Sequence, residues 1–191
     1  MTSRVAVVGS SGFVGQALVE RLSTLGIDTV ALSRSNTPDL RDVDADWSPF
    51  FAGCDAVVNC AGKAHDLSDL SIDDARTYVL VNGIAPGTLA RAAMAARVDR
   101  FVHLSTVKVL GDRTNGIPFR ESDPPNPQGV YALSKALGER QVITSTKGSS
   151  TSAVIVRIPL VIGRPFKGNL ALMERAIRAG MPLPLGHPSV A

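Results

Sequence analysis

The sequence predicts an α/β fold, a Rossmann-type doubly wound parallel sheet, from three observations. The chain opens with a short apolar run of Val and Ala at 5–8, which is typical of a strand buried on both faces. A glycine-rich turn, Gly9-Ser-Ser-Gly-Phe-Val-Gly15, then leads directly into an amphipathic stretch that ends at Leu25. Further short apolar runs alternate with helical patterns along the chain, and such alternation favours parallel strands joined by crossover helices.

The remaining elements follow in order along the chain. Strands are predicted, by apolar runs bounded by polar or turn residues, at 28–32, 55–62, 100–104 and 152–158. Helices are predicted at 13–25, 72–97, 131–147 and 169–179. Pro86 should kink the second of these helices, because proline cannot donate a backbone hydrogen bond. Residues 35–53 are polar and irregular, with room for one further short edge strand, and the Pro-rich stretch 117–128 is a connector.

Size and composition fit one soluble domain. The chain has 191 residues, enough for a sizeable core, with 45% hydrophobic and 19% charged residues. Its net charge is +3, but the Lys and Arg residues are scattered without interleaved aromatics, so we expect no nucleic-acid partner. The absence of a long apolar run or a basic-then-apolar leader predicts a cytoplasmic protein with no membrane span.

The two cysteines and the histidines carry weaker signals. Cys54 and Cys60 lie in or beside an apolar strand and are expected to be reduced core thiols. No grouping of His, Cys and carboxylates approaches zinc spacing, so we expect no metal site. His103 alternates inside a predicted strand and is expected in the core, whereas His65 follows a glycine turn near the predicted cleft mouth.

The glycine turn is the first candidate binding feature. Gly9, Gly12 and Gly15 stand between a strand and a helix. In such a turn one glycine permits the sharp bend, another lets a pyrophosphate approach the backbone, and the helix N-terminus presents N–H groups to the anion. Glycine triplets also arise by chance, but this position at the start of an α/β unit favours dinucleotide binding.

The end of the second strand bears on which dinucleotide is bound. An acidic residue there would hold the ribose hydroxyls of NAD, whereas an arginine suits a 2′-phosphate. The chain has Ser33 and Arg34 and no acid at this point, which favours NADP; the alternative is a solvated surface arginine. Asp46 could hydrogen-bond an adenine amino group, and Trp47 is expected to be a half-buried surface residue rather than a cover for the adenine.

Tyr131 and Lys135 form the second candidate functional feature. At i and i+4 the two side chains share one face of a helix. Lowering the pKa of a phenol from about 10 to about 7 takes about 4 kcal/mol of preference for the phenolate. The Lys135 ammonium and an oxidised nicotinamide ring could together supply it. Thr106, at the end of a predicted strand, offers a hydroxyl to orient a substrate oxygen, so with the glycine turn the pair indicates a catalytic site rather than an exposed helix pair.

Together these motifs resemble the extended short-chain dehydrogenase/reductase family, of the NAD-dependent epimerase/dehydratase type. Within it the chain is similar to the bacterial nucleotide-sugar 4-epimerases and 4-ketosugar reductases of polysaccharide biosynthesis. The stretches that carry the resemblance are GSSGFVG (9–15), NCAG (59–62), RFVHLSTVKVLG (100–111), YALSKALGE (131–139), RIPLVIGRPFKGN (157–169) and GMPLPLG (180–186). Relatives continue into a domain that closes over the sugar, so we expect a cofactor-binding Rossmann domain at 1–180 and the start of a truncated substrate-binding region at 181–191.

The resemblance implies a set of site residues. Cofactor-binding positions carried over from the family are Gly9, Gly12, Phe13, Val14, Gly15, Ser33, Arg34, Asp46, Ala61, Gly62, Tyr131, Lys135 and Ile158. Asn169 would bind the diphosphate of a UDP-type sugar, and Thr106 the sugar itself. Tyr131 would take the proton of the 4-hydroxyl while hydride passes from C4 to the cofactor. Relatives often dimerise through the helices that correspond to 72–97 and 131–147, so a homodimer is a further expectation.

Departures from the family keep three functions open. Thr106 stands where many relatives have Ser, Leu110 where they often have Tyr, and Asn59 where they often have His. The first function is epimerisation or reduction at C4 of a nucleotide sugar. The second is reduction of another carbonyl compound by NADPH. The third is that of a catalytically silent NAD(P)-binding module, which the apparent lack of a substrate domain suggests.

Overall fold

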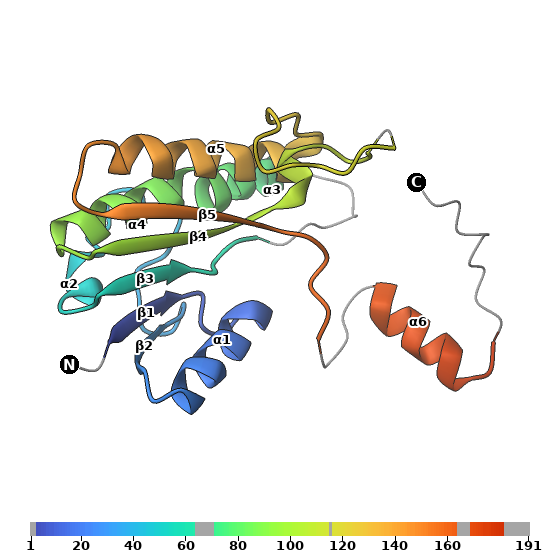
Figure 1. Ribbon diagram of the computed structural model, residues 1–191, viewed down its shortest axis with the longest axis horizontal. Helices are drawn as coiled ribbons and strands as arrows, with labels where there is room; N and C mark the ends of the chain where they lie inside the picture. Colours follow the sequence, from blue (N-terminus) through green and yellow to red (C-terminus); the bar gives the residue numbers. More distant parts are fainter. Residues whose placement is uncertain (1–2, 64–70, 115, 164–168, 182–191) are drawn as a thin grey trace.

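A five-stranded parallel sheet forms the centre of the protein. The computed structural model describes residues 3–63, 71–114, 116–163 and 169–181. The strand order is β2-β1-β3-β4-β5 (Figure 1), and every neighbouring pair is parallel. The strands are β1 (Arg4–Val8), β2 (Asp28–Leu32), β3 (Ala56–Asn59), β4 (Arg100–Thr106) and β5 (Ser152–Ile158). The predicted Rossmann-type α/β sheet is therefore confirmed.

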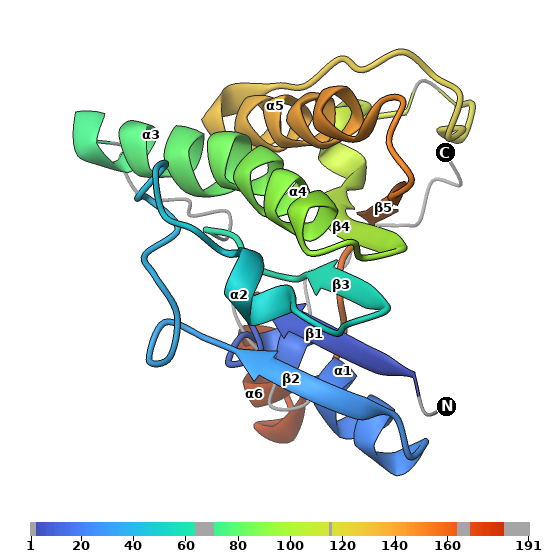
Figure 2. The ribbon, with the colours of Figure 1, turned by 90° about the vertical axis from the view of Figure 1, so that its left-hand side faces the viewer.

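Helices lie on both faces of this sheet. Figure 2 shows α1 on one face and α3, α4 and α5 on the other. The helical segments are α1 (Phe13–Thr24), α2 (Ser48–Phe51), α3 (Ile72–Tyr78), the π-helix η1 (Val79–Ile84), α4 (Ala85–Ala95), the 3₁₀ turn η2 (Val107–Val109), α5 (Gly129–Thr146) and α6 (Asn169–Arg178). Within the described ranges, none of these helices has the length and apolar character needed to cross a bilayer.

The core lies between the sheet and the layer formed by α4 and α5. Val57 of β3 and Phe101 of β4 are fully buried there against Leu89 of α4 and Val142 of α5. These apolar side chains occupy the sheet face that the helices cover, as expected for a layered α/β domain. The burial of β1 at Ala6, Val7 and Val8 reflects its central place between β2 and β3. By contrast, Val154 of the edge strand β5 is 44% exposed.

The segment between β2 and β3 differs from its expected form. In its described residues the structure contains no edge strand, and the segment instead ends in the short helix α2. Trp47 precedes this helix and is only 2% exposed, so the expectation of a half-buried surface tryptophan is wrong. Its ring packs beside Phe50 and Phe51, with centroids 5.9 and 6.4 Å away. Burial of this indole depends on α2, which a polar, aperiodic sequence did not reveal.

The long helical region predicted for 72–97 is interrupted, as its proline suggested. Pro86 lies in the first turn of α4 and has no N–H to donate toward the carbonyl of Asn82. The preceding turn widens into the π-helix η1, a feature found often at functional sites. Gly138 of α5 contacts this turn directly, because a Cβ at Gly138 would lie 2.2 Å from the Asn82 oxygen and 3.2 Å from Pro86 Cγ.

Candidate cofactor and active site

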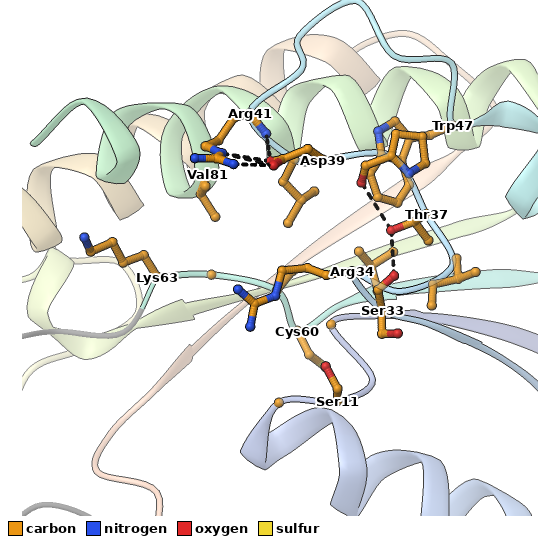
Figure 3. A pocket seen from close by; sticks show the side chains of 18 of the residues that line it. Ser11, Ser33, Arg34, Thr37, Asp39, Arg41, Trp47, Cys60, Lys63 and Val81 are labelled. Atoms are coloured by element: carbon orange, nitrogen blue, oxygen red, sulfur yellow. Dashed lines mark hydrogen bonds and ion pairs between the residues drawn. The ribbon is translucent and has the colours of Figure 1, made fainter. Parts of the chain in front are cut away.

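A cavity of about 390 Å³ opens at the carboxyl ends of β1, β2 and β3 (Figure 3). Its volume is within the range of small-molecule sites, and the carboxyl edge of a parallel sheet is where such folds bind ligands. Six predicted cofactor positions line it, namely Gly9, Gly12, Ser33, Arg34, Ala61 and Gly62. Further lining residues that sequence reasoning did not place there include Thr37, Asp39, Leu40, Arg41, Trp47, Lys63 and Val81.

The glycine turn forms one wall of the cavity and tolerates no side chain at two of its positions. Gly9 has a φ of 82°, in the left-handed region, and a Cβ there would lie 2.7 Å from the Cα and the backbone nitrogen of Ala61. A Cβ at Gly15 would lie 2.1 Å from the Gly9 carbonyl oxygen. The turn therefore brings β1, the start of α1 and the end of β3 into direct backbone contact.

Charge around the cavity is suited to an anion. Helix α1 begins after Gly12, which makes no side-chain cap, and its first turn carries no acidic residue to compete for the helix dipole. Among the described lining residues, Arg34, Arg41 and Lys63 carry positive charge against the single carboxylate of Asp39. The bare backbone cradle at Gly9, the helix N-terminus and this excess of cations together fit the pyrophosphate of a dinucleotide.

Several predicted cofactor residues lie outside the cavity lining. Phe13 and Val14 are the first residues of α1, and the Phe13 ring packs so closely on Gly163 that a Cβ there would lie 2.9 Å from Phe13 Cζ. The carboxylate of Asp46 accepts hydrogen bonds from the backbone and the hydroxyl of Ser48 at the start of α2. Ile158 ends β5, opposite Thr106 of β4. Contact of these residues with a cofactor stays a prediction.

Tyr131, Thr106 and Lys135 come together where β4 ends beside α5. The side chain of Thr106 lies close enough to the Tyr131 hydroxyl to lower the pKa of that phenol. Lys135, one turn further along α5, is 5% exposed, and its ammonium donates a hydrogen bond to the Leu104 carbonyl at 2.5 Å. Thr106 of β4 and the i, i+4 pair on α5 therefore lie together, and their catalytic role stays a prediction.

The ionisation of this group is set mainly by burial. Burial raises the pKa of Tyr131 above its ordinary value, and the neighbouring Thr106 side chain offsets part of that rise. Burial lowers the pKa of Lys135 to about 8, against the opposing effect of the Glu139 carboxylate. In this structure the Lys135 ammonium is directed at Leu104, and the expected lowering of the Tyr131 pKa by Lys135 together with an oxidised nicotinamide ring stays a prediction.

The reactive group adjoins the inner end of the cavity. Gly62 lines the cavity, and a Cβ there would lie 3.9 Å from Lys135 Nζ and 3.0 Å from Asn82 Oδ1. Cys60, another lining residue, has a pKa raised to about 11 by burial, while the positive charge of Lys135 acts in the opposite direction. A ligand that extends from the glycine turn along Cys60 and Gly62 would therefore reach Lys135.

Asn82 is a structural residue of the site that the sequence did not single out. It is fully buried in η1, and its amide bonds both backbone groups of Lys63, accepting from the N–H at 2.8 Å and donating to the carbonyl at 3.0 Å. It also donates to Ser134 of α5 at 3.3 Å. An isolated Asn four residues before a proline, in the otherwise apolar stretch 79–86, was the available signal. Asn82 thereby joins the segment after β3 to the helix that carries Tyr131.

A layer of aromatic and charged groups flanks Tyr131. The Tyr78 ring is 1% exposed and meets the Tyr131 ring edge-on, with centroids 6.2 Å apart. The Lys63 ammonium lies 4.9 Å from the centre of the Tyr78 ring and pairs with Asp74. The pKa of Asp74 is lowered to about 2, chiefly by its hydrogen bond with Lys63.

A second buried polar pair lies between β3 and β4. Asn59 accepts a hydrogen bond from the Ala61 N–H, so its amide nitrogen faces His103 Nδ1 at 3.1 Å. His103 is fully buried, as predicted for a core histidine, and burial holds its pKa well below the ordinary value. This neutral pair fixes the backbone at Ala61, where the cavity passes over the end of β3.

Some predictions fall outside the described residues. Asn169 begins α6, but its side chain is not among the groups that the structure describes. His65 and the predicted substrate-binding segment 181–191, apart from Met181, also lie outside the described ranges. Their assigned roles stay predictions.

Comparison with known proteins identifies the family. Residues 5–185 match the NAD dependent epimerase/dehydratase family. The chain is 34% identical over 198 residues to a UDP-glucose 4-epimerase of Vibrio cholerae, covering 97% of this chain and 60% of that protein. It is 32% identical over 180 residues to a dTDP-4-dehydrorhamnose reductase of Mycolicibacterium smegmatis, covering 94% and 52%.

The fold agrees with this match. MoeE5, solved in complex with UDP-glucuronic acid and NAD, superposes with a TM-score of 0.78 at 25% identity, covering 93% of this chain and 61% of that one. The chain therefore spans between half and two thirds of the length of these relatives. The glycine turn and the cavity lie at the carboxyl edge of the sheet, where Rossmann-type folds bind dinucleotides. The chain belongs to the NAD dependent epimerase/dehydratase family, related to nucleotide-sugar epimerases and dTDP-sugar reductases.

Proposed function

We propose that the protein moves hydride between NAD(P) and C4 of a nucleotide sugar, as an epimerase or a 4-ketosugar reductase. The observation that carries this proposal is the meeting of Tyr131, Thr106 and Lys135 beside Gly62, at the inner end of an anion-suited cavity. Relatives that are named for UDP-glucose and for a dTDP-sugar support the substrate class.

Each residue of the proposed site has a defined chemical task, and Lys135 has two. Tyr131 takes the proton of the sugar's 4-hydroxyl, or returns it in the reductive direction. The Thr106 hydroxyl, which lies beside the Tyr131 hydroxyl, orients the same sugar oxygen. When bound, NAD(P) serves as the acceptor or donor of the C4 hydride. Lys135 is placed to hold the cofactor's ribose and to favour the phenolate once its ammonium turns from the Leu104 carbonyl.

The cofactor-holding residues follow from the cavity lining. Gly9 and Gly12 would receive the pyrophosphate, and Ala61 and Gly62 would lie beneath the nicotinamide side. The guanidinium of Arg34 extends into the cavity (Figure 3), which supports the preference for NADP. An epimerase retains its cofactor through the cycle, so NAD(P) that copurifies tightly with the chain would favour that reaction over reduction.

A Tyr131→Phe variant tests the proposal. Loss of one hydroxyl should lower hydride transfer from UDP-glucose to NAD(P)⁺ by about 10²–10⁴-fold, the range for a lost general acid–base group. Absorbance of the reduced nicotinamide reports hydride transfer. Titration calorimetry should show that cofactor affinity changes by less than about twofold, which corresponds to about 0.4 kcal/mol.

Tyr78→Phe is the matched control, because it removes the hydroxyl of the neighbouring ring, and its loss should be far smaller. Equal losses in both variants would contradict the assignment of Tyr131. Cofactor binding without transfer in the unaltered chain would instead favour a silent NAD(P)-binding module. Transfer with a carbonyl compound that UDP does not inhibit would favour a different substrate.

A homodimer remains part of the proposal. α3 and α5 carry exposed apolar side chains suited to a helix-to-helix contact, among them Ile72, Leu133 and Ile143. Sedimentation analysis of the chain and of Leu133→Lys checks this, and a monomeric unaltered chain would contradict it.

A further inference from the structure

The wall of the cavity formed by residues 34–41 carries charges of both signs. Arg34, Asp39 and Arg41 all line the cavity. In Figure 3 the Arg34 guanidinium extends into the cavity, and the paired side chains of Asp39 and Arg41 lie above it. Of these three residues, which follow β2, the sequence predicted only Arg34 as a binding residue.

Asp39 and Arg41 form a tightly bonded pair. Arg41 Nε lies 3.0 Å from Asp39 Oδ1, and Nη2 lies 2.6 Å from Oδ2. The Arg41 backbone N–H also donates to Oδ1 at 2.8 Å. These bonds, chiefly those of the side chain, hold the pKa of Asp39 at about 2, and the charge of Arg34 contributes in the same direction. Asp39 is therefore anionic at physiological pH, and its field reaches both arginines.

A 2′-phosphate and a 2′-hydroxyl respond differently to such a field. The phosphate of NADP carries negative charge, so its affinity depends on the net charge of the groups around it. The corresponding hydroxyl of NAD is neutral and can donate to a carboxylate. Together Arg34, Arg41 and Asp39 have a net charge of +1, from two cations and one anion; without the carboxylate it would be +2.

We propose that Asp39 sets the balance between NADP and NAD, because it neutralises Arg41 and weakens the attraction of Arg34 for a 2′-phosphate. Asp39 then limits the preference for NADP in a site whose strand-end arginine favours NADP. Arg41 is a second cation near the 2′-phosphate, and the negative charge of Asp39 weakens its attraction for that phosphate. This inference rests on the proposed cofactor site.

The test compares Asp39→Asn with Asp42→Asn. Asn keeps the size of Asp and one acceptor oxygen, and it removes the negative charge together with the second acceptor. Asp42 is a matched control, since it lies three residues away, is exposed and does not line the cavity. Dissociation constants for NADP⁺ and NAD⁺ can be followed by titration calorimetry and by the fluorescence of Trp47, the only tryptophan of the chain, which lines the same cavity.

We expect Asp39→Asn to tighten NADP⁺ binding by about 3- to 10-fold at low salt and to leave NAD⁺ within about twofold, with the difference shrinking as salt is raised. The control should change neither constant. Arg41→Ala should weaken NADP⁺ and spare NAD⁺. The inference is overturned if Asp39→Asn shifts both cofactors equally, or if Asp42→Asn gives the same shift. A chain that binds neither cofactor would overturn the proposed function itself, whereas binding of both with an unchanged ratio would overturn only this inference.

Discussion

Two arginine–carboxylate pairs with similar bonding lie in very different surroundings. At the outer wall of the cavity, the side chains of Asp39 and Arg41 are 50% and 58% exposed. Beside the reactive group, Glu139 of α5 is only 5% exposed and binds Arg157 of β5 through both carboxylate oxygens. An exposed pair adds little to stability, whereas a buried one becomes costly once one partner is removed. Substitutions in the outer pair can therefore change cofactor preference at little cost in stability, whereas loss of either partner of the inner pair destabilises the fold.

The buried pair gives the largest expected effect on stability. Glu139→Ala leaves the Arg157 guanidinium without its carboxylate and should lower the free energy of unfolding by about 3–5 kcal/mol. Asp39→Ala should change it by less than about 1 kcal/mol. Urea denaturation of the two variants measures both values. Similar losses would contradict the contrast between the two pairs.

The buried cation Lys135 sharpens the contrast, because its removal should stabilise the protein. Its pKa in the folded chain, about 8, lies below the ordinary 10.5, so the unfolded chain binds more protons between these values. The cost of burying the ammonium is therefore full below about pH 8 and fades as pH rises toward 10.5. Lys135→Met should raise the free energy of unfolding by about 1–3 kcal/mol near pH 7 and much less near pH 10.

Urea denaturation at both pH values, with cofactor titration alongside, checks this prediction. The same variant should bind NAD(P) more weakly, since Lys135 is assigned to the cofactor's ribose. A variant that is destabilised equally at both pH values would show that the ammonium contributes packing or hydrogen bonding rather than a desolvation cost.

The exposed Arg34 gives the smallest expected effect, a change in affinity for NADP⁺ alone. Arg34→Ala should weaken NADP⁺ by about 10-fold, close to 1.4 kcal/mol, with NAD⁺ nearly unchanged and folding stability within about 0.5 kcal/mol. Titration with each cofactor separates the two. Equal weakening of both would refute the assignment of Arg34 to the 2′-phosphate.

The features that the sequence predicted well are those that depend on local geometry. The glycine turn requires Gly9 and Gly15 because backbone atoms occupy the places of their side chains, and a fixed spacing puts Tyr131 and Lys135 on one helical face. Apolar runs located the strands for the same reason. Thr106 could be joined to Tyr131 because it ends a predicted strand, at the sheet edge where such folds bind ligands.

The features that sequence reasoning missed depend on tertiary contacts. Trp47 is buried through α2, a helix of four residues with no periodicity to detect. Asp39 and Arg41 reach the cavity because an irregular loop folds over the end of β2, and loop paths leave no repeating pattern. The role of Asn82 depends on its hydrogen bonds with Lys63, which follows β3 and lies 19 residues earlier in the sequence.

The contact between Gly138 and the π-helical turn has a consequence for how the reactive side chains are aimed. Gly138 lies about two turns along α5 from Tyr131, and there is no room for a methyl group between it and the Asn82 carbonyl. Alanine at this position would push α5 away from the η1 turn. The start of α5, where Tyr131 lies, would then be displaced. The alignment of Tyr131 with Thr106 thus depends on Gly138, a residue of α5 that does not line the cavity.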